Sequence, residues 1–328
     1  MFSRTVATVA AAVQEFRMQE WKTMNREEWG LLVLLSVLWG GAFFCVGIAL
    51  VELPPLTVVL ARVGIAAVFL LVLSWILGHS LPRSLSAWTP FLVMGVLNNV
   101  LPFSFLNAGQ TMVSVGLASI MNAMTPLFTA LVMASFREER LTTNRVVGVL
   151  IGVVGVAVIV WPDALSNDAR LLGIGLCLSG ALSYGFAVLW GRRYLADVAP
   201  VKSATCQLIA STFVISVVVA VVDRPWTLPL PGAGTWLALG ALALFGTALA
   251  YIVFFEILVR AGGSNAMLVT LLIPVSALLL GNLFLSEPIF MFEIGGAAII
   301  GLGLLFFDGR LPHRIIRLAT DRTNIRNH

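Results

Sequence analysis

Charged residues are scarce in this sequence. Asp, Glu, Lys and Arg make up only 11% of its 328 residues, whereas soluble globular proteins carry about 25%. Apolar residues make up 59%, against about 45–50% in soluble proteins. This composition argues against a water-soluble fold and predicts a chain that lies mostly within a lipid bilayer.

Histidine and cysteine are also rare, with three of each. Cys45, Cys177 and Cys206 fall inside apolar runs, where a thiol behaves as a small apolar side chain. The histidines lie outside these runs, and the sequence has no metal-ligand spacing, nucleophile motif or nucleotide-binding motif. We therefore predict a protein that is not an enzyme and that binds no cofactor and no metal.

Ten apolar runs of roughly 18 to 24 residues are each long enough to cross the hydrocarbon core as a helix. They predict an all-α integral membrane protein with ten transmembrane helices, because a backbone in lipid must satisfy its own hydrogen bonds. The predicted spans are 29–50, 54–77, 88–109, 114–136, 144–161, 171–190, 203–222, 235–258, 264–285 and 289–307.

The basic residues predict the orientation of the chain. Most of the 20 Lys and Arg residues fall before the first span, after the last span, or in the loops on that same side. Arg170 and Arg224 lie on the other side, and Arg62 lies within a span. The positive-inside rule therefore places both termini in the cytoplasm. The net charge of +4 is explained in this way, and we predict no nucleic-acid partner.

The two halves of the chain repeat one another. An offset of 148 aligns Pro126 with Pro274, Glu139 with Glu287, and Gly148 with Gly296. Earlier in the halves an offset of 145 aligns Trp39 with Tyr184, Pro55 with Pro200, and Arg62 with Gln207. Because each half has an odd number of spans, the second half must be inverted relative to the first.

The predicted organisation has four parts. Residues 1–28 form a cytoplasmic extension, 29–161 the first five-helix repeat, 171–307 the second, and 308–328 a basic cytoplasmic tail. Either Met1 or Met24 could be the start of the natural chain.

The repeated features resemble the drug/metabolite transporter superfamily, in particular its ten-helix EamA-type branch. The resemblance rests on Trp39-Gly40, on the proline-bearing fourth and ninth spans, and on Glu139-Arg140-Leu141 and Glu287-Pro288-Ile289, each followed by a glycine-rich helix. It implies a secondary transporter of the bacterial inner membrane, often an exporter, with a cavity between the two halves and with the fifth and tenth helices at the periphery.

Arg62 is the first candidate for the substrate site. It lies about eight residues into the second span, roughly 12 Å deep, which is too far for easy snorkelling. Two readings are equally balanced. In the first, the guanidinium attracts an anionic substrate group, and in the second it pairs with an interior carbonyl or carboxylate.

The fourth and ninth spans supply a second candidate. A proline inside a helix frees the carbonyl four residues earlier, and here these carbonyls belong to Asn122 and Thr270. We predict that both residues face a substrate site at the interface of the repeats. The alternative is that Thr125 or a neighbouring helix satisfies the freed carbonyl.

Other polar and aromatic residues complete the predicted substrate-binding set. Asn98 and Asn99 put an unusual polar load on the third span, and Gln207 is the counterpart of Arg62. Trp39, Tyr184 and Tyr251 could form aromatic walls, although ordinary helix packing explains aromatics as often. The glycines of the fifth and tenth spans are interpreted as packing surfaces.

Two acidic residues within spans are better explained without transport. Glu293 could titrate during coupling, but a place near the outer head groups is favoured. Glu256 has the spacing for a salt bridge with Arg260.

We therefore predict a secondary-active transporter that exports a small metabolite, such as an amino acid, by alternating access. Uptake or exchange is the alternative, and an intramembrane lipid-modifying enzyme is a weaker one. Its partners are a small-molecule substrate and the lipid bilayer, and a homodimer is compatible with the sequence.

Overall fold

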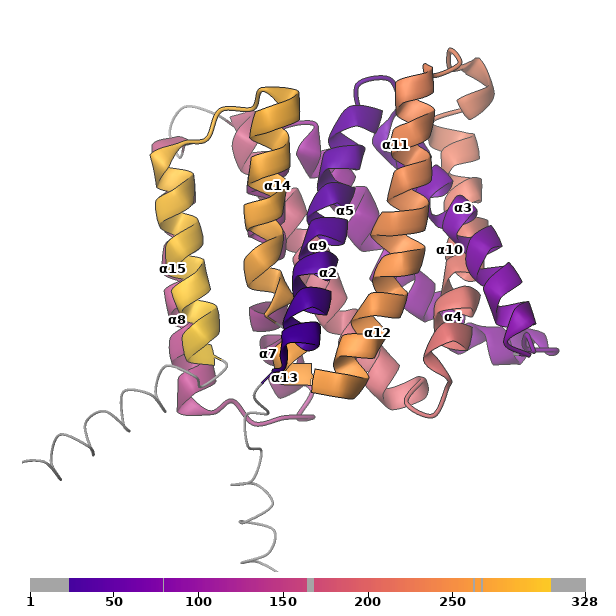
Figure 1. Ribbon diagram of the computed structural model, residues 1–328, viewed down its shortest axis with the longest axis horizontal. Coiled ribbons are helices and arrows are strands. Elements are labelled where there is room, and N and C mark those ends of the chain that lie inside the picture. The colour runs from indigo at the N-terminus through magenta and orange to yellow at the C-terminus, as the bar shows by residue number, and fades with distance from the viewer. Residues whose placement is uncertain (1–23, 79, 164–167, 262, 267, 308–328) are drawn as a thin grey trace, which may run out of the picture.

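The computed structural model describes residues 24–78, 80–163, 168–261, 263–266 and 268–307. All regular elements in these ranges are helices, and they stand side by side in one bundle (Figure 1). Eight helical segments are at least 18 residues long and apolar enough to cross a membrane, and two further apolar helices have 17 residues each. The predicted tail, 308–328, and the predicted extension up to residue 23 lie outside the described residues.

The first half contains five predicted spans. They are α2 (Arg26–Ala49); α3 (Pro55–Ile76); the segment η1 (Leu85–Trp88), α4 (Thr89–Gly95), η2 (Val96–Val100) and α5 (Leu101–Gln110); the pair α6 (Val115–Asn122) and α7 (Thr125–Ser135); and α8 (Thr143–Val160). The helix α2 begins three residues before the predicted Trp29, because Asn25 and Glu28 form a capping box there.

The second half contains the other five. After η3 (Trp161–Asp163) come α9 (Asp168–Tyr194); α10 (Pro200–Val222); η4 (Pro225–Thr227) with α11 (Ala233–Ala243), η5 (Leu244–Leu249) and α12 (Ala250–Ala261); α13 (Gly263–Ala266) with α14 (Val269–Leu285); and α15 (Met291–Phe307).

Polar contacts between distant segments define the two ends of the bundle. We call the end where α2 begins the proximal end and the opposite end the distal end. At the proximal end Glu27 approaches Arg260, at the end of α12, and Glu139 pairs with Arg192, near the end of α9. At the distal end Arg170, at the start of α9, pairs with Glu293 of α15. The helices α2 and α9 therefore start at opposite ends, as an inverted repeat requires.

Helix contacts follow the repeat. The equivalent helices α3 and α10 pack together, as do α8 and α15, and the two proline-bearing spans meet where α6 packs on α14. Other contacts come in exchanged pairs, because α2 packs on α12 and α14 while α9 packs on their counterparts α5 and α7. This pattern is that of two related halves facing each other across a pseudo-two-fold axis.

The dipeptides Trp39-Gly40 and Tyr184-Gly185 lie at equivalent helix crossings in the two halves. A Cβ atom on Gly40 of α2 would collide with Ser276 of α14, and one on Gly185 of α9 would lie 3.3 Å from the backbone of Phe128 in α7. The Ser276 hydroxyl donates a hydrogen bond to the carbonyl of Ser36 at the first crossing (2.7 Å). The two glycines therefore allow each first helix to approach the proline-bearing span of the other half.

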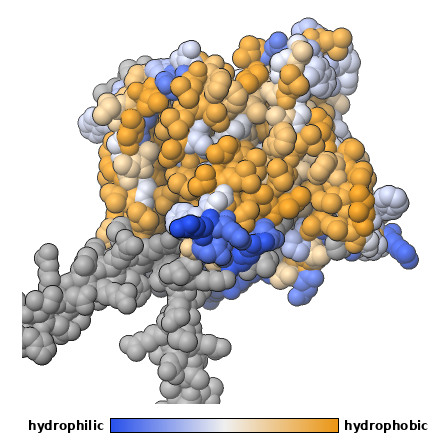
Figure 2. Space-filling view, viewed as in Figure 1, coloured by the Kyte–Doolittle hydropathy of each residue, from blue (hydrophilic) through white to orange (hydrophobic). Residues whose placement is uncertain are grey.

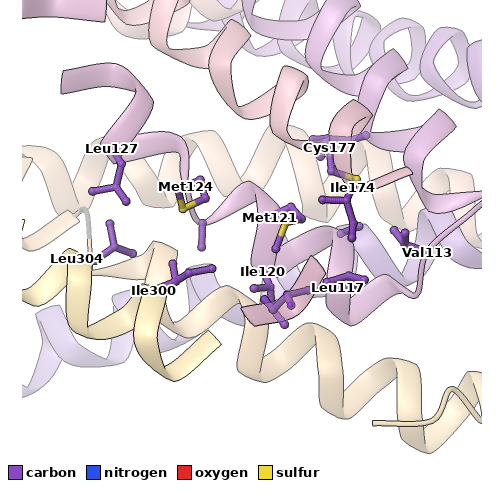
Figure 3. Close-up of a cluster of buried hydrophobic side chains, with 14 residues drawn as sticks. Val113, Leu117, Ile120, Met121, Met124, Leu127, Ile174, Cys177, Ile300 and Leu304 are labelled. Carbon is purple, nitrogen blue, oxygen red and sulfur yellow. The ribbon is translucent and has the colours of Figure 1, made fainter. Parts of the chain in front are cut away.

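An apolar core lies where α6 and α7 meet α9 and α15 (Figure 3). Leu117, Met121 and Leu127 are almost completely buried there, against Cys177 of α9 and Ile300 of α15. The outer surface is apolar over the middle of the bundle, and hydrophilic residues gather toward its ends (Figure 2). Both features agree with an element that spans a bilayer.

The helices α8 and α15 pack at one edge of the bundle through glycines (Figure 1). A Cβ atom would lie 2.8 Å from the Gly155 carbonyl if added to Gly296, and 2.8 Å from the Gly148 carbonyl if added to Gly303. Their backbones thus touch, as expected for a small-residue interface. Gly301 is different, because its nearest neighbour would be Leu271 at 3.6 Å.

Adjacent glycines of α15 offer a matched test of this interface. Gly296→Ala is expected to lower the melting temperature of the purified protein in detergent, because overpacking costs about 1–3 kcal/mol. Gly295→Ala is the control, since a Cβ atom there meets nothing within 4 Å and alanine favours the helix. Equal melting temperatures for the two variants would contradict the close packing.

Candidate functional site

Arg62 lies in the interior of the bundle. Its Nε donates a hydrogen bond to the Thr247 hydroxyl (3.0 Å) and its Nη2 donates to the Gly246 carbonyl (3.4 Å). Its Cζ lies 3.7 Å from the centre of the Phe103 ring, in cation–π geometry. The residue is seven positions after Pro55, where α3 begins at the distal end, so it lies roughly 10 Å into the bundle.

Arg62 has no carboxylate partner among the described residues. Two of the five guanidinium N–H groups are used by Thr247 and Gly246, which leaves donors for another acceptor. A charge at this depth in a membrane protein is costly unless something compensates it. The site therefore has an excess positive charge and donors directed at no carboxylate.

A hydrogen-bonded network near Arg62 joins η2 to α10 and α12. The Asn98 amide donates to Gln207 Oε1 (3.1 Å) and to the Tyr251 hydroxyl (3.3 Å). The Tyr251 hydroxyl donates to Asn99 Oδ1 (3.3 Å), and Asn99 Nδ2 donates to Ser211 Oγ (2.9 Å). Side chains of α10, α12 and η2 are thus joined in one network across the interface of the halves.

Two π-helical turns shape the site. The turns η2 and η5 occupy equivalent places in the two halves, since the offset of 148 places Val96 on Leu244. The Thr247 hydroxyl in η5 donates to the Leu242 carbonyl (3.1 Å) and is therefore free to accept from Arg62. Such single turns within α-helices are frequent at functional sites.

The structure brings five of the nine predicted residues together: Arg62, Asn98, Asn99, Gln207 and Tyr251. Tyr184 lies close enough for the charge on Arg62 to act on its phenol, and its hydroxyl has no hydrogen-bond partner within the described ranges. Trp39 lies elsewhere, with its ring 5.6 Å from that of Phe254.

The members of this group differ in accessibility. Asn99, Gln207 and Thr247 are buried, whereas Arg62, Asn98, Tyr184 and Tyr251 keep part of their surface accessible. The four accessible residues lie on four different helical segments, α3, η2, α9 and α12. The arrangement can present donors, acceptors and aromatic faces to a small solute.

The expected role of the Asn122 carbonyl is wrong. That carbonyl accepts a hydrogen bond from the Thr125 hydroxyl (2.7 Å), so the helix satisfies it locally, and the chain turns at Ala123 and Met124 between α6 and α7. The side chain remains of interest, because Asn122 Oδ1 is buried and has no partner among the described residues.

Thr270 lies on the wall of a separate cavity of about 310 Å³ between α6, α14 and α15. Its other lining residues are apolar, and they include Ile120, Pro274, Val275 and Ile300. The offset of 148 makes Asn122 and Thr270 counterparts, but their surroundings differ.

Two acidic side chains are engaged elsewhere. Glu293 pairs with Arg170 (2.6 Å) at the distal end, and Glu256 pairs with Arg260 as its spacing predicts.

The sequence analysis did not predict two residues of the site, Thr247 and Ser211. The repeat could have found Thr247, because it is the counterpart of Asn99, and Ser211 lies one helical turn after Gln207.

Known proteins resemble the chain over nearly all its described length. The EamA-like transporter family matches residues 28–161 and again 171–307. An uncharacterized transporter from Archaeoglobus fulgidus is 26% identical over 85% of this chain and 97% of its own. The uncharacterized inner membrane transporter YedA from Escherichia coli (strain K12) is 28% identical over 77% of this chain and 81% of its own.

A solved crystal structure has a similar fold. It superposes with a TM-score of 0.60 over 86% of this chain and 96% of that chain, at 18% sequence identity. At this identity the likeness concerns the fold alone.

The network predicts a contrast between two serines of α10. Ser211→Ala is expected to destabilise the protein by about 0.6–1.7 kcal/mol, the range measured for hydrogen bonds between membrane helices, because Asn99 Nδ2 loses its acceptor. Ser216→Ala is the control, since that exposed hydroxyl bonds only to its own helix. Thermal unfolding in detergent measures both, and an equal effect would show that the network adds no stability.

Proposed function

The chain belongs to the EamA-like transporter family, and from this premise we propose that it exports a small metabolite bearing a carboxylate or similar anionic group. Export is secondary-active and proceeds by alternating access between the two inverted halves. An amino acid or a similar amphipathic solute fits this description.

The observation that carries the proposal is the charge on Arg62. Its remaining N–H donors suit a carboxylate, which an arginine binds with two parallel hydrogen bonds. Since none of the described carboxylates pairs with Arg62, a bound anion would supply the missing charge. The bond to the Gly246 carbonyl fits the structural alternative in part, and the lack of a carboxylate beside Arg62 among the described residues supports a substrate role in addition.

The neighbouring groups suit the rest of such a solute. The Asn98 amide and the hydroxyls of Tyr184 and Tyr251 offer polar contacts, and the Phe103 ring offers an apolar face. Small-molecule sites combine apolar walls with few polar groups in this way. Asn122, whose Oδ1 lacks a partner among the described residues, is proposed as a further contact from α6.

The proposed location is the bacterial inner membrane with both termini in the cytoplasm. The relative YedA is named as an inner membrane transporter. The proximal end carries Arg137 and Arg140 after α7, and Arg192 and Arg193 in the last turn of α9, so the positive-inside rule supports a cytoplasmic proximal end.

The direct test reconstitutes the full chain in proteoliposomes. A panel of labelled amino acids, other carboxylates and neutral analogues is offered with and without an imposed pH gradient. Saturable movement of at least one anionic or zwitterionic solute is expected. If no solute moves while a lipid is chemically altered, the protein is an enzyme and the proposal fails.

Arg62→Gln replaces the arginine by glutamine, the residue found at its counterpart in the second half, Gln207. It is expected to weaken transport of anionic solutes about 10- to 100-fold, because a charged hydrogen bond contributes about 1.5–3 kcal/mol. Neutral analogues should lose much less. The measurement is the concentration dependence of uptake into proteoliposomes.

Two further variants separate the effect of the charge on Arg62 from that of its planar donor geometry and from general effects of removing an arginine. Arg62→Lys keeps the charge but not the planar pair of donors, and it should retain part of the preference for anions. Arg83→Gln alters an exposed loop arginine and should change nothing. Equal losses for anionic and neutral solutes in Arg62→Gln would rule out anion attraction.

Asn122→Leu tests the contact from α6. Transport should weaken while the melting temperature stays the same, because Asn122 Oδ1 has no described partner to lose and Thr125 still satisfies the backbone carbonyl. Thr270→Val probes the matched position of the second half, which lines the separate cavity, and should weaken transport less than Asn122→Leu. Unaltered transport in both variants would leave these residues with a packing role only.

A further inference from the structure

Two carboxylates at the distal end bind the start of a span in the opposite half. Glu52, between α2 and α3, accepts a hydrogen bond from the backbone N–H of Gly232, the residue before α11 (2.8 Å). Glu287, between α14 and α15, accepts with both oxygens from the backbone N–H of Val115, where α6 begins (3.0 Å each). Each contact therefore joins one half of the protein to the other.

The surroundings hold Glu287 in place. Ser286 has a left-handed conformation (φ 55°) that ends α14, and the Glu287 N–H then donates to the Gly281 carbonyl (3.2 Å). A Cβ atom on Gly281 would lie only 2.5 Å from the Glu287 carboxylate. The glycine thus leaves room for the carboxylate beside α14.

The start of α6 is packed tightly at this end. A Cβ atom on Gly116 would collide with Leu278 of α14, and one on Gly47 of α2 would lie 2.8 Å from Val115. The distal end is therefore closed around the contact made by Glu287.

The repeat predicts equivalent contacts at the proximal end. The offset of 145 makes Asp197 the counterpart of Glu52, and the offset of 148 makes Glu139 the counterpart of Glu287. By the same offset, Ser84 corresponds to Gly232 and Gly263 to Val115.

These equivalent contacts are absent among the described residues. Glu139 instead accepts from Arg145 (2.6 Å) and Arg192 (2.7 Å), and the Asp197 carboxylate has no hydrogen bond there. Partial burial raises the pKa of Glu139, but hydrogen bonds and charges from the two arginines outweigh it and hold that pKa below its usual value. Glu139 is thus held as an anion away from the start of α13.

We propose that these four carboxylates are the latches of alternating access. Glu52 and Glu287 hold the distal end closed in the observed conformation, and Asp197 and Glu139 close the proximal end by binding the backbone at Ser84 and Gly263 when the distal pair releases. The inference rests on the proposed function, since inverted repeats exchange conformations as the transporter changes the side to which it opens. A carboxylate suits this role because the first N–H groups of a helix lack partners within it and attract negative charge.

A native cysteine reports the state of the latches without any substrate. Cys45 on α2 is partly accessible and lies near Arg62, whereas Cys177 and Cys206 are buried. Right-side-out and inverted membrane vesicles are treated with a membrane-impermeant maleimide, and mass spectrometry locates and quantifies the label on Cys45. The rate of modification from each face measures how often each end opens.

The two pairs of latches should have opposite effects. The double variant Glu52→Gln/Glu287→Gln should raise the rate from the distal face about 4- to 25-fold, since each of the two charged contacts at a helix start shifts the equilibrium about two- to fivefold. Glu139→Gln/Asp197→Asn should lower the distal rate and raise the proximal one. Glu138→Gln is the matched control, because that residue pairs with Arg193 at the proximal end and should leave both rates unchanged.

Distal rates that stay at the wild-type level in the first variant, or that rise in both double variants, would overturn the latch proposal. Labelling needs no transported solute, so a failed search for substrates leaves this result readable. If the protein transports a solute but the latch variants leave the labelling rates of Cys45 unchanged, the latch proposal fails while the proposed function stands.

Discussion

The central site depends on one constraint, a guanidinium that lies about 10 Å inside a membrane bundle and has no carboxylate partner in the part of the chain that the structure describes. The protein compensates this charge with the Thr247 hydroxyl, the Gly246 carbonyl and the face of Phe103. The first two acceptors belong to η5, where the π-helical turn aims a hydroxyl and a carbonyl at α3. The buried charge on Arg62 and the π-helical turn η5 therefore form one feature, because the turn supplies the acceptors that stabilise the charge.

The duplicated scaffold is symmetric, but the chemistry it carries is not. Both halves have a π-helical turn in their third span, yet the first carries Asn98 and Asn99 where the second has Gly246 and Thr247. Likewise a cation on α3 has a neutral amide, Gln207, as its counterpart on α10. Divergence of paired positions therefore gives the site one cation, on α3, and an amide network that joins η2 to α10 and α12.

The spans, the repeat and the main polar residues could be predicted, because a charge or an amide stands out in an apolar helix. Ser211 could not be distinguished from residues that pack helices, since small hydroxyl side chains are common in both roles, whereas Thr247 could have been identified only from its repeat counterpart, Asn99. The π-helical turns could not be predicted either, because no sequence pattern in η2 or η5 distinguishes them from ordinary α-helix. At Asn122 both outcomes could be stated from the sequence, but not which one holds. The structure confirms the alternative, in which the Thr125 hydroxyl satisfies the carbonyl that the proline frees.

Packing around the two proline-bearing spans indicates which one has room to move. Leu127 of α7 is 1% exposed and fills the space over Gly152 of α8, but its counterpart on α14, Val275, is 55% exposed and borders the 310 Å³ cavity. Since α8 and α15 touch through their glycine backbones, they act as a fixed edge for both halves. The related helices α7 and α14 thus differ in how they meet that edge. A close-packed helix can shift only by compressing its neighbours, whereas α14 can shift into the cavity. The asymmetry of packing and the asymmetry of the carboxylate contacts therefore occur together in the observed conformation.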